Sequence, residues 1–420
     1  MSNHQKITIG LFGFGVVGEG LYRVLTQTPS LNGSIKKVCI KHPEKKRNAP
    51  AALFTTSKEE LLNDDAINVI VEVIDDAKAA FDITRTALQK GKAVVSASKK
   101  MIAEHLPEIL RLQQETGLPF LYESAACASI PVIRNLEEYY DNDLLHAIRA
   151  IVNGSTNFIL TKMFEEKIGF DAALKRAQEL GFAESDPLLD VAGFDAANKW
   201  VILLNHAYGI VCSQEALLFS GIQHIQLSDA QFAEEKKLVI RLVAQAQKLA
   251  NGKVAAFVLP QLLPASDQLA GVKNEYNGVV IESGFADKQF FYGKGAGSLP
   301  TGSAVLSDIS ALRYHYRYEY KKLYHHEPAQ LTNDFFLKVF LSFDDWTKVP
   351  REDFLAIEEW HSGPVRSYLT GIIHYRKLKT GGWWRRPGIS LLLLPDAVIE
   401  PGELSASLPL PEEKETALPV

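Results

Sequence analysis

Residues 7–18 read I-T-I-G-L-F-G-F-G-V-V-G, and an amphipathic stretch, E-G-L-Y-R-V-L, follows them. A short apolar run, a glycine turn and a helical pattern in this order predict strand, turn and helix. In such a turn Gly13 allows the tight bend, Gly15 the close approach of a pyrophosphate, and Gly18 the packing of helix on strand. Glycine turns are common, but the strand before and the helix after this one favour dinucleotide binding. The predicted cofactor contacts are Gly13, Phe14, Gly15, Val16, Val17 and Gly18.

The next segments continue an alternation of strands and helices. Residues 66–74 form a continuous apolar run of the kind found in buried parallel strands, a helical pattern covers 77–90, and strands are predicted at 93–96 and 119–122. This alternation predicts a doubly wound α/β Rossmann sheet, in which ligands bind at the carboxyl ends of the strands. Lys99 and Glu123 follow two of these ends.

The choice of cofactor depends on the end of the second predicted strand, residues 37–41. An NAD-selective site usually has an acidic residue there to accept the ribose 2′-hydroxyl. This chain instead has a basic run, K-H-P-E-K-K-R, from Lys41 to Arg47. Lys41 and Lys45 are therefore candidates to bind a 2′-phosphate, which favours NADP over NAD; a solvated basic loop is the alternative.

Composition excludes several classes of protein. The chain has 420 residues, of which 46% are hydrophobic, and a formal net charge of -5, which suits two or three globular domains and gives no case for nucleic acid or an anionic membrane. The three cysteines have no metal spacing, and no apolar run approaches a membrane span. Because the N-terminus shows no signal peptide, we expect a cytoplasmic protein.

Residues 181–199, G-F-A-E-S-D-P-L-L-D-V-A-G-F-D-A-A-N-K, carry the clearest chemical signal. Four carboxylates and one lysine stand here among apolar residues. Asp195 and Lys199 are four positions apart, so they share one face of the helix predicted at 195–208, whose apolar continuation reads as buried. A lysine on a buried helix with carboxylates near it is a candidate for proton transfer. The alternative is a structural buried pair.

Two further turns open predicted helices. Residues 153–157, N-G-S-T-N, follow a predicted strand at 148–152, and backbone amides there suit a carboxylate, while a helix cap by Ser155 or Thr156 is the simpler explanation. Residues 292–303 form a second glycine-rich turn, either a packing turn or a contact to substrate or cofactor. Helices are also predicted at 170–180 and 229–250, and strands at 254–258 and 278–281.

Taken together, these segments resemble homoserine dehydrogenase. The matching motifs are GFGVVG, SASKKMIAEH, YESAACASIPVI, NGSTNFILTKM, AQELGFAESDPLLDVAGFDAANK and YGKGAGSLPTGSAV, in this order over residues 5–312. The resemblance implies NAD(P)-linked interconversion of L-aspartate 4-semialdehyde and L-homoserine, a step towards threonine, methionine and isoleucine. It also implies a homodimer formed through the substrate domain.

The resemblance assigns roles by position. It implies that Lys199 and Lys99 lie at the reacting carbonyl, with Asp195 beside the first lysine. Glu184 and Asp190 match acids that bind the substrate or order water, and the turn at 154–156 suits the α-carboxylate. Glu123, with backbone carbonyls of Ala126 and Ala128, matches a site for a monovalent cation, Na+ or K+. The remaining implied contacts are Gly154, Ser155 and Thr156 to substrate, and Ser98, Lys99 and Gly302 to cofactor.

Several positions depart from the family pattern. Asp75-Asp76 replaces a Gly-Gly pair, Ser98 replaces an asparagine, and Cys127-Ala128-Ser129 replaces glycines of the cation loop. These changes leave open a non-catalytic NADP-binding amino-acid sensor, and a dehydrogenase for a related amino-acid aldehyde is a further alternative. Intact Lys99, Glu184, Asp195 and Lys199 favour the enzyme. Because no aspartate kinase segment precedes the motifs, we expect a monofunctional protein.

The C-terminal part matches the family less well. Residues 311–329 read as a helix-like aromatic stretch, and beyond them strands at 335–343, 368–378 and 389–394 with a helix at 351–360 suggest a degenerate ACT-like α+β domain. Feedback by threonine stays open. The sequence predicts a Rossmann domain at 1–130, an α+β catalytic and dimerisation domain at 131–312, the C-terminal domain at 313–400 and a disordered tail at 401–420.

Overall fold

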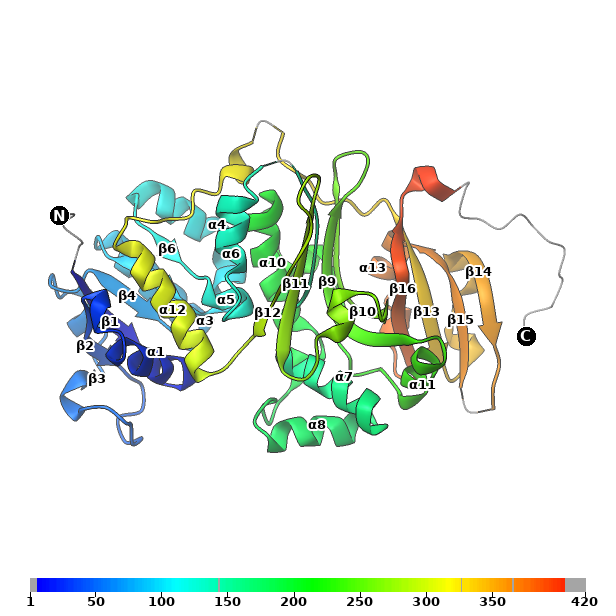
Figure 1. Cartoon of the computed structure of the whole chain (residues 1–420), viewed down its shortest axis with the longest axis horizontal. Helices are drawn as coiled ribbons and strands as arrows, with labels where there is room; N and C mark the ends of the chain where they lie inside the picture. Colours follow the sequence, from blue (N-terminus) through cyan, green and yellow to red (C-terminus); the bar gives the residue numbers. More distant parts are fainter. Residues whose placement is uncertain (1–5, 143, 326, 365, 405–420) are drawn as a thin grey trace. The chain divides into compact units, whose positions relative to one another are not determined.

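A computed structural model describes residues 6–142, 144–325, 327–364 and 366–404 (Figure 1). The chain forms two compact units that are interleaved along the sequence, whereas the sequence predicted consecutive domains. Of the described residues, those within 1–143, 198–214 and 293–328 form unit 1, and those within 144–197, 215–292 and 329–420 form unit 2. Residues 405–420, most of the predicted tail, lie outside the described part.

Unit 1 is built on a six-stranded parallel sheet with the order β3-β2-β1-β4-β5-β6. This order confirms the predicted doubly wound fold, and its switch point lies between β1 and β4. The strands are β1 Ile7–Phe12, β2 Gly33–Cys39, β3 Phe54–Thr55, β4 Val69–Glu72, β5 Ala93–Ser96 and β6 Phe120–Leu121. The helices are α1 Val16–Thr26, α2 Glu59–Leu62, α3 Ala77–Gln89, α4 Lys99–Thr116, α5 Ser124–Cys127, α6 Val132–Arg134 and α12 Ser298–Leu312.

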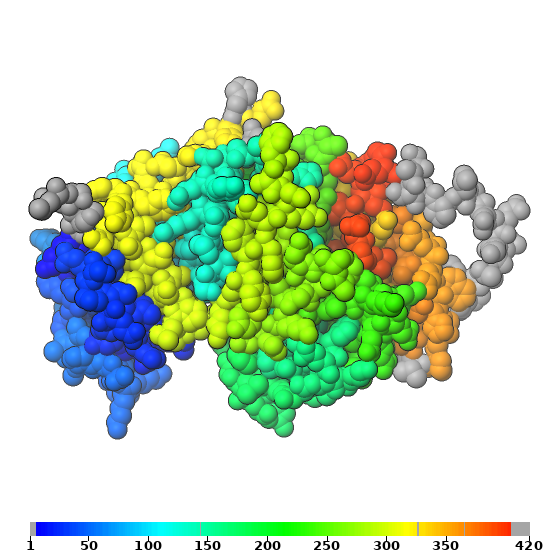
Figure 2. All heavy atoms as spheres, in the orientation of Figure 1, coloured from blue at the N-terminus to red at the C-terminus, as the bar shows by residue number. Residues whose placement is uncertain are grey.

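Helices α1 and α12 pack closely although they lie far apart in the sequence, so the blue and yellow atoms of unit 1 meet in Figure 2. Glycines make this approach possible: a Cβ on Gly302 would lie 2.5 Å from the backbone of Gly20, and one on Gly20 would lie 2.0 Å from the carbonyl oxygen of Ser298. This burial against α1 favours the packing interpretation of Gly302. The glycine-rich turn opens α12, as predicted.

Unit 2 contains a ten-stranded mixed sheet with the order β12-β11-β7-β9-β10-β16-β13-β15-β14, and β8 pairs with β10. The strands are β7 Leu145–Ile151, β8 Leu218–Phe219, β9 Leu238–Lys248, β10 Val254–Pro264, β11 Tyr276–Ser283, β12 Asp287–Lys294, β13 Phe336–Phe343, β14 Phe354–His361, β15 Ser367–His374 and β16 Ile389–Ile399. The helices are α7 Gly154–Glu166, α8 Phe170–Glu179, α9 Leu188–Val191, α11 Leu227–Glu235 and α13 Tyr375–Gly381; α10, Phe194–Tyr208, begins in unit 2 and ends in unit 1.

The C-terminal strands belong to this same sheet. β16 pairs in parallel with β10, and in Figure 2 the red atoms of β16 accordingly lie beside green ones. The predicted helix at 351–360 is wrong, because β14 covers most of it and pairs with β15 at the edge of the sheet. Phe354, Ile357 and Trp360 pack against the core of these strands, and this packing outweighs the helix propensity of the intervening glutamates. The strand–helix–strand–strand order expected of an ACT-like domain is therefore absent from the described residues.

Two other predicted helices are corrected. The pattern at 229–250 divides into α11 and strand β9, whose register with β10 runs from Leu238 to Lys248. Its β-branched residues pack in a sheet paired on both edges, which local periodicity does not reveal. Residues 311–329 contain the end of α12 and one short 3-10 turn, Lys321–Tyr324, because their tyrosines pack individually into unit 1. No described helix is long and apolar enough to cross a membrane.

Candidate active site

The glycine turn after β1 has the geometry that the sequence predicted. Gly13 has φ +95°, which favours glycine, and a Cβ on Gly18 would lie 2.3 Å from the carbonyl oxygen of Gly13. A Cβ on Gly15 would meet nothing within 4 Å, so the backbone at the start of α1 faces open space. This turn therefore leaves room for a pyrophosphate against the helix N-terminus, and the residues present fit a dinucleotide.

The basic loop after β2 uses only part of its charge for structure. Arg47 donates to the carbonyl oxygens of Lys45 and His42, both at 2.7 Å, and its guanidinium lies over the ring of Phe54. Lys41 and Lys45 are exposed, and none of the described residues forms an ion pair with either ammonium. Their charge is available for an anion at the carboxyl end of β2.

The acidic pair that departs from the family pattern has a structural explanation. Asp76 caps α3, because its Oδ1 accepts a hydrogen bond from Ala79 N at 3.0 Å, and both Asp75 and Asp76 are exposed. The buried acid of this region is Glu72, at the end of β4. Its oxygens accept from Ile74 N at 2.7 Å and from Ser96 Oγ at 2.6 Å. Burial raises the pKa of Glu72 to about 7.

Glu72 should make the stability of the protein depend on pH. Since its pKa rises from 4.5 to about 7 on folding, the neutral form is favoured, and the free energy of unfolding falls as pH rises through this window. Glu72→Gln keeps one acceptor and one donor for the same neighbours. We expect the variant to lose a pH-dependent contribution on the order of 3 kcal/mol between about pH 4.5 and 7, measured by urea unfolding. An unchanged slope would contradict the assignment.

Ser96 links the Glu72 carboxyl to the backbone just before Lys99, the first candidate catalytic lysine in the sequence. Its Oγ also accepts from Ser98 N at 3.0 Å, and Ser98 precedes α4, of which Lys99 is the first residue. Lys99 is half-buried at the carboxyl end of β5, where the sequence placed it. The buried Glu72 carboxyl therefore supports both loops that follow the central strands.

In unit 2, Asn153 joins two of the predicted carboxylates. Its Nδ2 donates to Asp190 Oδ1 and to Asp195 Oδ2, both at 2.8 Å, while its Oδ1 accepts from Thr156 N at 2.8 Å and so caps α7. The sequence singled out the turn at 154–156 but did not assign Asn153 a role. The available signal was an asparagine at a helix-cap position, because its amide oxygen can cap the helix while its amide nitrogen donates hydrogen bonds to carboxylates.

The neighbouring turn residues are arranged around the start of α7. Thr156 is buried, its hydroxyl bonded to Asn153, and Ser155 Oγ donates to Phe182 O at 2.6 Å. Gly154 lies against backbone, because a Cβ there would be 2.6 Å from the carbonyl oxygen of Glu275. Glu184 is exposed on the turn after α8 and is not part of the Asn153 cluster. The structure thus groups Asp190 and Asp195 and leaves Glu184 apart from them.

Helix α10 carries the candidate acid–base pair. Asp195 and Lys199 stand one turn apart near its start, and their exposed fractions are 5% and 7%. The predicted helix at 195–208 is confirmed within one residue. A buried ammonium and a buried carboxylate on one helix face suit proton transfer at a carbonyl oxygen.

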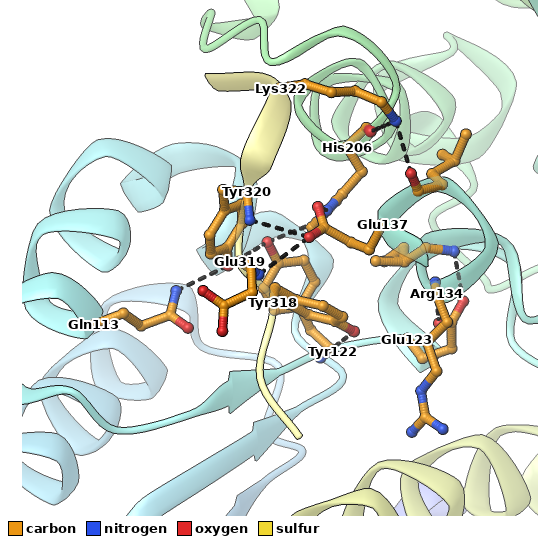
Figure 3. A network of polar contacts seen from close by, with 12 residues as sticks. Gln113, Tyr122, Glu123, Arg134, Glu137, His206, Tyr318, Glu319, Tyr320 and Lys322 are labelled. Carbon is orange, nitrogen blue, oxygen red and sulfur yellow. Dashed lines mark hydrogen bonds and ion pairs between the residues drawn. The ribbon is translucent and has the colours of Figure 1, made fainter. Parts of the chain in front are cut away.

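Glu123 is held by backbone amides. Its two oxygens accept from Ile133 N at 2.8 Å and from Arg134 N at 2.9 Å, and its own N–H donates to Asp308 Oδ2 (Figure 3 shows Glu123 and Arg134). Burial raises the pKa of Glu123 to about 8 and that of Asp308 to about 6. Ala128 has φ +42°, so alanine adopts the backbone conformation that a glycine of the family would take more easily.

Two family models match consecutive parts of the chain. A family model described as homoserine dehydrogenase, NAD binding domain, matches residues 13–123, and one described as homoserine dehydrogenase matches residues 131–310. The homoserine dehydrogenase of Bacillus subtilis is 36% identical over 317 residues, covering 73% of each chain, and that of Lactococcus lactis is 34% identical over 316 residues, covering 73% of this chain and 74% of that protein.

Solved structures extend the similarity. The crystal structure of a homoserine dehydrogenase from Thiobacillus denitrificans matches with a TM-score of 0.81 and 26% identity, covering 93% of this chain and 98% of the other. A hyperthermophilic archaeal homoserine dehydrogenase mutant in complex with NADPH matches with a TM-score of 0.63 and 27% identity, covering 75% of this chain and all of the other.

Proposed function

The chain belongs to the homoserine dehydrogenase family and is an NAD(P)-dependent oxidoreductase of that activity, and we propose that Lys199, Lys99 and Asp195 are its catalytic residues. The observation that carries this assignment is the burial of Asp195 and Lys199 one turn apart on α10, with Asn153 joining Asp195 to Asp190. The activity itself is tested by the reduction of NADP by purified protein with L-homoserine, followed through the absorbance of the reduced nicotinamide. Absence of turnover with intact NADP binding would contradict the activity, and with it the catalytic role of these residues.

The reaction exchanges a hydride at carbon and a proton at oxygen. A dinucleotide held at the turn from Gly13 to Gly18 would supply or accept the hydride. In the direction of reduction, negative charge develops on the aldehyde oxygen, where the Lys199 ammonium stabilises it and delivers a proton. Asp195 keeps the ammonium oriented, and Lys99 adds positive charge from the cofactor unit. In the direction of oxidation the same lysine, neutral, accepts the hydroxyl proton.

The amino-acid part of the substrate needs a cation site and an anion site. The turn of Gly154, Ser155 and Thr156 at the N-terminus of α7 would bind the α-carboxylate through backbone N–H groups and hydroxyls. Glu184 would bind the α-ammonium, and Asp190 would order water near it. The bond from Ser155 to Phe182 supports this proposal, because it fastens the turn before Glu184 to the start of α7.

Glu184→Gln should mainly weaken amino-acid binding, since it removes the charge that would pair with the α-ammonium. We expect the KM for L-homoserine to rise about tenfold to a hundredfold, with the KM for NADP unchanged, in steady-state kinetics. Asp186→Asn, a change at another exposed acid of the same turn, is the matched control. Unaltered KM and kcat for Glu184→Gln would remove Glu184 from the binding site.

We propose that the protein prefers NADP, because Lys41 and Lys45 are exposed after β2 where an acidic residue would favour NAD. Replacing both lysines by alanine should weaken NADP binding about tenfold to a hundredfold and leave NAD binding nearly unchanged, measured by fluorescence titration with each cofactor. Replacement of Lys36 and Lys37, on the strand before them, is the control. Equal loss for both cofactors would show that neither lysine recognises the 2′-phosphate.

A monovalent cation is the second proposed ligand of unit 1. Glu123, with backbone carbonyls of Ala126 and Ala128, would hold it, and the cation would favour the charged form of Glu123, whose pKa burial and the nearby Asp308 raise; Arg134 forms an ion pair with Asp308. Each Glu123 oxygen accepts one N–H group and keeps a further lone pair. These oxygen atoms therefore suit a hard monovalent cation. Adding K+ or Na+ to the assay tests this site.

Assembly and location complete the proposal. We propose, on the resemblance to the family, a cytoplasmic homodimer formed through the substrate domain at residues 131–312, with the Rossmann domain at residues 1–130. A mass from light scattering equal to that of one chain would contradict the dimer.

A further inference from the structure

A buried polar network lies in unit 1, outside the residues assigned to the reaction (Figure 3). Its centre is His206, in the last turns of α10. His206 Nδ1 lies 2.6 Å from Glu137 Oε1, and its Nε2 lies 2.9 Å from Tyr122 Oη. All three side chains are buried. The network therefore connects α10 to the end of the cofactor-binding sheet, since Tyr122 directly follows β6.

Three tyrosine rings surround the imidazole. The ring centroids of Tyr122, Tyr318 and Tyr320 lie 5.4, 5.0 and 5.4 Å from that of His206. The hydroxyl of Tyr320 also lies 3.1 Å from that of Tyr122 and accepts from Gln113 Nε2 of α4 at 2.8 Å. Aromatic faces and one carboxylate thus enclose the ring of His206 from several elements of unit 1.

Both carboxylate oxygens of Glu137 take part in hydrogen bonds. Its Oε2 accepts from the backbone N–H groups of Glu319 and Tyr320 at 3.2 and 3.1 Å, in addition to the contact of Oε1 with His206. Burial alone would raise the pKa of Glu137, but His206, the Tyr320 N–H and Lys322 together lower it below its ordinary value. The carboxylate is therefore ionised at neutral pH and holds the segment 316–324 against α10.

Lys322 and Gly209 secure the end of the helix. Lys322 Nζ donates to His206 O, near the C-terminus of α10, at 2.8 Å, and to Leu136 O, in the helical turn Asn135–Tyr139, at 2.7 Å, so it ties the end of α10 to that turn. Gly209 has φ +69°, and a Cβ there would lie 2.5 Å from the backbone of Lys322. These contacts fix the position of the last turns of α10 in unit 1.

The position of α10 at His206 also determines the position of the candidate catalytic lysine, Lys199. Lys199 and His206 are seven residues apart, about two turns or roughly 10 Å along the axis, so they share one face. Both belong to the part of α10 that lies in unit 1. Rotation or sliding of α10 at His206 would move the Lys199 ammonium by a similar amount. A displacement of about 1 Å at a reacting group can cost about a hundredfold in rate.

We propose that Glu137 and His206 are positioning residues, which fix the rotation and height of α10 in the cofactor unit and thereby place the Lys199 ammonium. This inference rests on the proposed role of Lys199. Glu137 and His206 touch neither substrate nor cofactor in it, and their effect on rate passes through the helix.

Glu137→Gln is the sharpest variant. A carboxylate accepts from all three neighbours, whereas glutamine has one acceptor oxygen, so its amide would face either a backbone N–H donor or the His206 ring, which must then change its tautomer. We expect kcat to fall about tenfold to a hundredfold and the KM for NADP to stay within threefold. Amide hydrogen exchange of residues 199–208 should become faster in the variant. Tyr122→Phe, which removes only the hydroxyl, should give a smaller loss of the same kind.

The matched control separates positioning from stability. Lys92 is buried at the amino end of β5, and its Nζ donates to Asp64 O and Ile67 O, both at 2.7 Å. Lys92→Met should lower the Tm of the protein, as Glu137→Gln should, but leave kcat and the hydrogen exchange of α10 unchanged. Equal kcat for Glu137→Gln and Lys92→Met would overturn the proposal, and if Glu137→Gln does not fold, Tyr122→Phe decides in its place.

A double-mutant cycle shows whether the effect passes through Lys199. In a Lys199→Ala background, Glu137→Gln should cause no further loss of kcat, because the group that it positions is gone. Full additivity of the two losses would contradict the inference while leaving the proposed function intact. Normal turnover of Lys199→Ala alone would instead overturn the role of Lys199 on which the inference depends.

Discussion

Lys199→Ala should reduce kcat about 100-fold to 10,000-fold, the range that a positioned general acid or base contributes, and leave the affinity for NADP unchanged. The lysine is buried on α10 one turn after Asp195, whereas the glycine turn that would bind the cofactor follows β1. The variant therefore loses the group at the developing oxyanion and keeps the cofactor contacts. Single-turnover rates, with NADP binding measured separately, test this expectation.

Lys199→Arg separates the two contributions of the lysine. Arginine keeps the positive charge but does not release a proton in this pH range. If the ammonium acts by proton transfer, Lys199→Arg should be nearly as slow as Lys199→Ala. A rate close to that of the natural protein would show that charge alone suffices, and unchanged turnover in both variants would remove Lys199 from the mechanism.

The parts of the fold that the sequence predicted correctly depend on local signals. The turn from Gly13 to Gly18 needs a positive φ, an open backbone and a close helix contact, and glycine at these positions is visible in the chain itself. The β5 strand and helix α10 follow from apolar runs of the right period and length. These features need no knowledge of a distant partner.

The errors arose where distant pairing decides the structure. Strand β9 has a pattern that also suits a helix, and its pairing with β7 and β10 selects the strand. Strand β14 contains glutamates that favour a helix, and its contact with β15 at the sheet edge outweighs them. In both cases the deciding partner lies elsewhere in the chain, so the local period is ambiguous.

The candidate site shows the same division. The residue types of Asp190, Asp195 and Lys199 were recognisable in one continuous stretch, and the structure does join the two aspartates. Asn153, which joins them, lies about 40 residues earlier, and the donor role of its amide nitrogen is recognisable only when the cap of α7 is seen in three dimensions. His206 reads in the sequence as one more residue on a buried helix.

Asn153→Asp should reduce kcat/KM by a hundredfold or more at neutral pH. The change is nearly isosteric and retains the oxygen that caps α7, but it replaces the Nδ2 donor, 2.8 Å from each of Asp190 and Asp195, by a third carboxylate oxygen. Leaving a buried carboxylate without its hydrogen-bond donor costs about 1–3 kcal/mol, and the like charge brought against Asp190 and Asp195 adds to this cost. The variant should therefore misplace Asp195 and with it the acid–base pair.

The pH dependence of this variant gives the test its specificity. Crowded carboxylates have raised pKa values, so one of the three takes up a proton as pH falls and restores a donor to the cluster. Activity of Asn153→Asp relative to the natural protein should accordingly rise towards lower pH. Asn153→Ala, which removes the cap and the join without adding charge, should show a loss that does not depend on pH. If the activities of the two variants depend on pH in the same way, Asn153 contributes only the cap of α7 and not the link between Asp190 and Asp195.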